Sequence, residues 1–106
     1  MAKYLVHGSY TTEGLKGLLK EGGTSRRATI EGLINSMGGK MESFYYAYGD
    51  EDVYVIADVP DEETMTAVAL VVNASGAVNV KTTVLITPEA VDAAVKKTVD
   101  YRPPGA

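Results

Sequence analysis

Three features of the sequence predict an α+β fold: the order of its apolar periodicities, one nearly continuous apolar strand, and breaker or capping residues between the segments. Patterns of strand period and of helix period follow one another as β, α, β, β, α, β, with the first helix in two pieces and a short helix after the last strand. This order is typical of the ferredoxin-like fold, in which a four-stranded antiparallel sheet carries its helices on one face.

The first half of the chain contains one predicted strand and two helical pieces. Residues 3–10 are rich in β-branched and aromatic types, which favours a strand. Thr11 can cap a helix that Gly22-Gly23 interrupts, since paired glycines disfavour the helical backbone. A second helix begins near Ser25 and ends at Gly38-Gly39, a normal C-terminal stop.

The second half contains three predicted strands. Residues 41–48 form the second strand, and residues 53–59 are a nearly continuous apolar run that suits a central strand. The acidic turn after Pro60 starts a helix, and residues 78–86 alternate clearly between apolar and polar types. Thr87-Pro88 then opens the short last helix. We expect one domain over residues 1–100 and a flexible tail over residues 101–106.

Composition excludes several classes of function. The 106 residues carry a net charge of −4, and the ten basic residues are scattered, whereas a nucleic-acid-binding protein gathers them in a stripe. There is no cysteine, so disulfides, thiolate catalysis and cysteine-based metal sites are absent. No apolar run has the length of a signal peptide or a membrane span, and we expect a cytoplasmic protein that binds no membrane, metal or cofactor.

Several short motifs, in their order along the chain, resemble the GYD-domain family over roughly the first 90 residues. They are Tyr10-Thr11, Gly38-Gly39-Lys40, Phe44-Tyr45, Gly49, Pro60-Asp61 and Asn79-Val80-Lys81-Thr82. The family is similar to small bacterial proteins of dimeric α/β-barrel type, so the resemblance implies that fold and leaves the biochemical role open. One position departs from the family: Glu51 stands where its name-giving motif has a tyrosine before the aspartate.

One face of the predicted sheet has no helix to cover it. Alternation places Leu5 and His7 of the first strand on this face, together with Lys81 and Leu85 of the last strand. Such a mixture of apolar and polar side chains is typical of an interface or a ligand surface. We therefore expect a homodimer that forms through this face.

His7, the only histidine, is the main candidate for a functional side chain, because histidine titrates near neutral pH. Lys81 and Tyr54 lie on the strands expected to flank it, and Tyr46 of the aromatic run is a candidate for a flat wall. Together these four side chains predict a site for a small anionic or phenolic ligand. The alternative, which a lone histidine favours, is a histidine packed in the dimer interface with its polar atoms satisfied.

Two functions remain open. The first is a homodimeric small-molecule-binding or interaction module. The second is a cofactor-independent enzyme, similar to a small monooxygenase or isomerase, that acts on a planar organic acid or phenol in a pocket on the uncovered face. Only the analogy between folds supports the enzyme.

Overall fold

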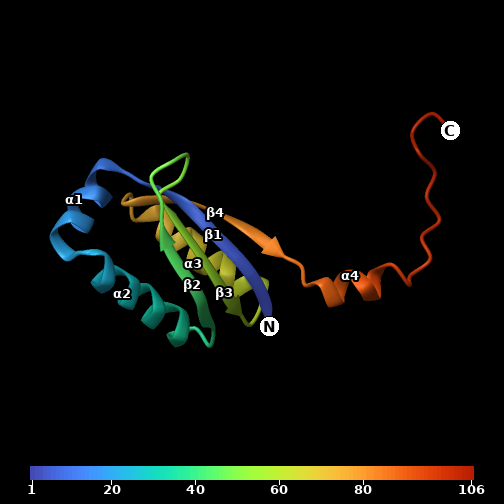
Figure 1. Cartoon of the computed structure of the whole chain (residues 1–106), viewed down its shortest axis with the longest axis horizontal. Coiled ribbons are helices and arrows are strands. Elements are labelled where there is room, and N and C mark those ends of the chain that lie inside the picture. The colour runs from blue at the N-terminus through green and yellow to red at the C-terminus, as the bar shows by residue number, and fades with distance from the viewer.

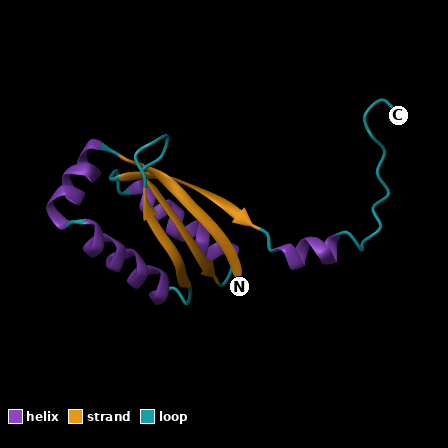
Figure 2. Cartoon of the chain, in the orientation of Figure 1, coloured by secondary structure: helices purple, strands orange, loops and turns teal.

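The computed structural model describes all 106 residues. Its elements are β1 (Ala2–Tyr10), α1 (Thr12–Glu21), α2 (Gly23–Ser36), β2 (Lys40–Tyr46), β3 (Val53–Val59), α3 (Glu62–Ala74), β4 (Val78–Leu85) and α4 (Pro88–Ala94). The strands form one antiparallel sheet in the order β2-β3-β1-β4. The predicted α+β fold of ferredoxin-like type is thus confirmed, and Figure 1 and Figure 2 show the sheet with its helices.

The two faces of the sheet have different surroundings. In Figure 1, α3 lies behind the sheet and no helix crosses in front of it. We call the face toward α2 and α3 the inner face and the opposite one the outer face. The outer face is formed by Lys3, Leu5, His7 and Ser9 of β1, Lys40, Ser43 and Tyr45 of β2, Tyr54, Ile56 and Asp58 of β3, and Asn79, Lys81, Thr83 and Leu85 of β4.

The hydrophobic core lies between the inner face and the helices. β3 supplies alternate residues to it, α2 supplies Ile34 and α3 supplies Met65. The complete buried cluster is Tyr4, Ile34, Met41, Val53, Val55, Ala57, Val59 and Met65. Burial of these side chains is the main force that holds the helices on the sheet.

Capping side chains fix where the helices begin. The Thr11 hydroxyl accepts the N–H of Gly14 at 3.2 Å, and the N–H of Thr11 donates to the Ala77 carbonyl at 3.0 Å. These bonds attach the start of α1 to the turn that precedes β4. At α3 the Asp61 carboxylate accepts the N–H of Thr64 at 2.8 Å, and this bond lowers the pKa of Asp61.

The helical region between β1 and β2 consists of two pieces, as the sequence predicts. Gly22 separates them with a φ of 87°, a value that glycine adopts without steric strain. The second piece begins at Gly23, slightly before the expected Ser25, and β2 ends at Tyr46 rather than at residue 48.

The chain after β4 is separate from the body of the protein. No residue after Leu85 is buried, and α4 with the last residues extends away from the sheet (Figure 1). None of the helices is both long and apolar enough to cross a lipid bilayer.

Candidate functional site

Three of the four predicted site residues lie together on the outer face. In the sheet His7 pairs with Tyr54 of β3 on one side and with Lys81 of β4 on the other. The rings of His7 and Tyr54 are stacked, with centroids 6.1 Å apart and an interplanar angle of 6°. The structure therefore places these side chains as neighbours, whereas a role for them in binding stays a prediction.

Both ring nitrogens of His7 have partners. Nδ1 donates to the Glu51 carboxylate, and Nε2 lies 3.0 Å from the Thr83 hydroxyl. The side chains of His7 and Glu51 are each only 16% exposed, so this contact is largely shielded from water. A histidine with both nitrogens satisfied matches the structural alternative better than it matches a free general base.

The loop between β2 and β3 brings Glu51 to His7. The N–H of Asp52 donates to the Gly8 carbonyl at 2.8 Å, and the Asp52 carboxylate accepts the N–H of Tyr10 at 3.0 Å. These two bonds hold the loop against the end of β1. Glu51, the position that departs from the family motif, therefore has a defined structural role. In the sequence, the only sign of this contact is that the turn after Gly49 is acidic.

Tyr46 does not belong to this group, and the expectation that it lies beside His7 is wrong. It pairs with Val53 on the inner face and meets Phe44 edge-on, with ring centroids 5.1 Å apart. Its hydroxyl donates to the Gly23 carbonyl at 3.0 Å. The physical reason is that Phe44 and Tyr46 share one face of β2, and the helices cover that face. Tyr45 occupies the outer face instead.

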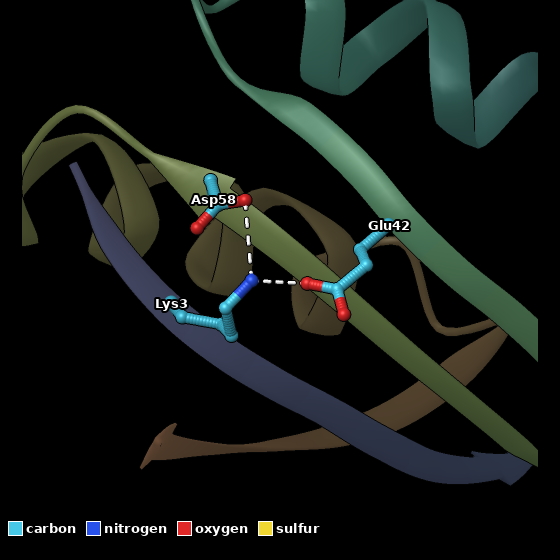
Figure 3. Close-up of polar contacts among 3 residues, drawn as sticks. All are labelled: Lys3, Glu42 and Asp58. Carbon is cyan, nitrogen blue, oxygen red and sulfur yellow. Dashed lines mark hydrogen bonds and ion pairs between the residues drawn. The ribbon is translucent and has the colours of Figure 1, made fainter. Parts of the chain in front are cut away.

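An ion cluster occupies the other end of the outer face. Lys3 contacts the Glu42 carboxylate, and its Nζ lies 3.4 Å from Oδ2 of Asp58 (Figure 3). The contact with Glu42 is the main cause that raises the pKa of Lys3. Because water reaches these groups, the cluster contributes little to stability and serves mainly to place charge at this end.

The inner face contains an apolar cleft between α2 and α3. Its volume is about 80 Å³, and 16 of its 17 lining residues are hydrophobic. Phe44 of β2, Ile30 of α2 and Val72 of α3 lie on its different sides. The cleft is thus on the face opposite to the one where the sequence predicts a pocket. Such apolar concave spaces with a few polar groups are the usual sites for small ligands.

Arg26 is the one charged side chain that lines the cleft, and Tyr10 lines it nearby. The ion pairs of the chain involve Lys3, His7 and Lys16, so the Arg26 guanidinium has no carboxylate partner. Burial raises the pKa of Tyr10, and the adjacent Arg26 cation partly offsets this effect. Burial likewise raises the pKa of Tyr46 to about 12. Both phenols are therefore neutral hydrogen-bond donors at physiological pH.

The sequence contains a signal for Arg26 in the helical spacing of α2. Arg26, Ile30, Leu33 and Met37 recur at helical spacing and all four line the cleft. Arg26 therefore continues the apolar stripe of α2 toward the start of the helix. Arginine is seldom buried without a partner, so a half-buried arginine at the end of an apolar stripe is a candidate for binding an anion.

The raised pKa of Tyr46 leads to a prediction on alkaline stability. Because its pKa is about 12 in the folded chain against 10.0 as the reference value, the stability linked to the neutral phenol is complete below pH 10. It is lost as the pH rises through 12. Tyr46→Phe should therefore reduce the loss of unfolding free energy between pH 10 and pH 12, measured by urea unfolding. Tyr45→Phe, which removes an exposed phenol of the same strand, should keep the wild-type loss.

The structure brings together no group of three or more histidine, aspartate or glutamate side chains that could hold a metal ion. Glu51 and Asp52, in the turn between β2 and β3, have the structural roles described above. What the cleft offers chemically is one cation, one neutral phenol and an apolar wall.

Comparison with known proteins adds one finding. No match was found among curated proteins or among solved structures. The family model of the GYD domain matches residues 4–95. This range contains all four strands except the first two residues of β1. This match covers most of the 106 residues, including those that carry the motifs of β1, β2 and β4. The chain belongs to the GYD-domain family.

Proposed function

We propose that the chain is a homodimeric small-molecule-binding module whose ligand occupies the cleft of the inner face. The observation that carries this proposal is the combination of an apolar cleft with a single unpaired cation, Arg26. The ligand is a small carboxylate or phenolate whose apolar part is a short chain or a single ring.

The chemistry of the cleft supports this class of ligand. A guanidinium at the edge of an apolar space is attracted to an anion more strongly than it is in water, because the local dielectric constant is lower. Tyr10, which lines the cleft beside Arg26, can donate an additional hydrogen bond to the same anion from the neutral state. The small volume of about 80 Å³ favours a slim apolar group over a bulky one.

The outer face supports the dimer. Leu5 and Ile56 are half-buried neighbours at its centre, and no helix covers them. Tyr45 and Tyr54 add exposed aromatic area beside them. Aromatic and aliphatic side chains bounded by charged groups are typical of the surfaces through which subunits associate. Two outer faces packed around a twofold axis would bury this patch and enclose the His7 group.

The enzyme alternative is less well supported. Because Nδ1 of His7 donates to Glu51, the basic atom of the neutral ring is Nε2, and the Thr83 hydroxyl already engages it. Lys81, the adjacent cation, is exposed to solvent rather than directed into a closed space. The contacts of the His7 group therefore favour a structural role at an interface over a catalytic one.

Binding of hexanoate, measured by calorimetry on the wild type and two arginine variants, tests the proposal. Arg26→Gln should weaken binding at least about tenfold, because a hydrogen-bonded charge contact contributes roughly 1.5–3 kcal/mol. Arg27→Gln removes the same charge from the exposed neighbouring position and should leave the affinity unchanged. Hexanamide, which has the same shape and no charge, should not distinguish the variants.

Two results would contradict the cleft as the ligand site. One is equal weakening by the two arginine variants, which would mean that only net charge matters. The other is a binding site that His7→Ala abolishes and Arg26→Gln leaves intact, because the ligand would then sit on the outer face.

A further inference from the structure

The chain after β4 forms an arm without any packing partner. We call residues 86–106 the C-terminal arm; it contains α4 and is exposed throughout. Its apolar side chains Ile86, Val91, Val95, Val99 and Tyr101 are between 49% and 77% exposed. Figure 1 shows the arm standing away from the sheet and its helices.

The exposed state of α4 is physically unfavourable. A helix of 7 residues is far shorter than the length at which isolated helices become stable in water. Its start is nevertheless well formed, because the Thr87 hydroxyl accepts the N–H of Ala90 at 3.1 Å and Pro88 occupies the first turn. Val91 and Val95 lie one turn apart and so share one face of this segment. A helix with local start signals and one apolar face needs a surface to pack on.

A groove between α3 and β4 offers such a surface. Its volume is about 330 Å³, and Tyr4, Met65 and Ala69 are among the residues that line it. Leu70 of α3 and Val84 of β4 also line it, with 66% and 57% of their surface exposed. The groove therefore has room for several aliphatic side chains and contains apolar residues that nothing covers in the single chain.

The connection between β4 and α4 directs the arm away from the groove of its own chain. Thr87 has φ −73° and ψ 153°, the extended conformation that a residue before proline prefers. The chain therefore continues outward after β4. A return to its own groove would require a tight reversal within the few residues between Val84, which lines the groove, and α4.

The distribution of charge indicates the orientation in which such an arm would lie in the groove. Lys96 and Lys97 directly follow Val95, and both are exposed. Glu62 lies at one end of the groove, in the acidic first turn of α3 beside Glu63. A helix that places Val91 and Val95 in the groove can bring the two lysines to this acidic turn.

We propose that the C-terminal arm packs in the α3–β4 groove of a second copy of this chain, and that the second copy's arm does the same in return. This inference rests on the proposed homodimer. Reciprocal exchange of identical segments satisfies the symmetry of a two-subunit assembly and covers the apolar side chains of both arms.

Disulfide cross-linking tests the exchange directly, because the natural chain has no cysteine. A Val91→Cys chain and a Leu70→Cys chain, with different tags, are mixed and oxidised. The expected product is a disulfide-linked dimer that contains both tags. The control pairs Val91→Cys with Lys16→Cys on the exposed side of α1, and this mixture should give no such product.

A second measurement uses the full chain without cysteine. Val91→Asp with Val95→Asp should weaken the dimer at least about tenfold in light scattering, because charge opposes burial in an apolar groove. Ala93→Asp, on the other side of α4, should leave the dimer intact.

The outcomes separate the two proposals. A dimeric wild type whose cysteine variants form no disulfide between the two tags overturns the exchange and leaves the homodimer standing. A wild type that remains monomeric at micromolar concentration overturns both.

Discussion

Leu5→Lys should convert the homodimer into folded monomers. Leu5 lies at the centre of the outer face between Ile56 and Thr83. In a twofold interface the substitution would therefore bury two lysines, one from each subunit. Burial of an unpaired ammonium group is strongly unfavourable, and we expect the dissociation constant to rise at least about 100-fold. Light scattering coupled to gel filtration measures this change.

Leu19→Lys is the matched control for this experiment. Leu19 is 87% exposed on α1, away from the sheet, and the same substitution there should leave the dimer unchanged. Circular dichroism should show a folded chain for both variants, because neither residue belongs to the buried core cluster. A dimer that survives Leu5→Lys with wild-type affinity would show that the subunits meet elsewhere.

Gly14→Ala and Gly17→Ala, two substitutions in one helix, should have opposite effects on stability. A Cβ atom at Gly14 would lie 1.8 Å from the carbonyl oxygen of Ala77, where α1 abuts the turn before β4. The backbone must shift to relieve this clash, and we expect a loss of about 3 kcal/mol in the free energy of unfolding.

Gly17 has open space around it and no atom within 4 Å of such a Cβ. Alanine there should stabilise the helix by about 0.5–1 kcal/mol through its better helix propensity. Urea unfolding of the two variants measures both effects. Equal stabilities would mean that α1 does not pack against the turn as described.

The fold was predictable because the sequence patterns of β1, β3 and α3 are unambiguous. Alternation in β1 correctly separated Tyr4 and Val6 from Leu5 and His7, and no bulge interrupts that strand. The bulge lies in β2, between Met41 and Ser43. Because both faces of β2 carry aromatic side chains, the sequence did not show which of them the helices cover.

The candidate site was only partly predictable. His7, Tyr54 and Lys81 are neighbours because strand register follows from the order of the strands. The contact between His7 and Glu51 depends on the path of a loop, which is set by the two hydrogen bonds between Asp52 and the end of β1. Likewise, the cleft exists because α2 and α3 lie apart over the sheet, a distance that residue periodicity does not encode.

The central claim is that the inner face binds the ligand while the outer face serves the dimer. A titration of the wild type with hexanoate, followed residue by residue through the amide signals in NMR, tests it most directly. The expected result is a saturable set of shifts concentrated at Tyr10, Arg26 and Phe44, which line the cleft. Shifts concentrated at His7 and Lys81, or no saturable shift at all, would contradict the claim.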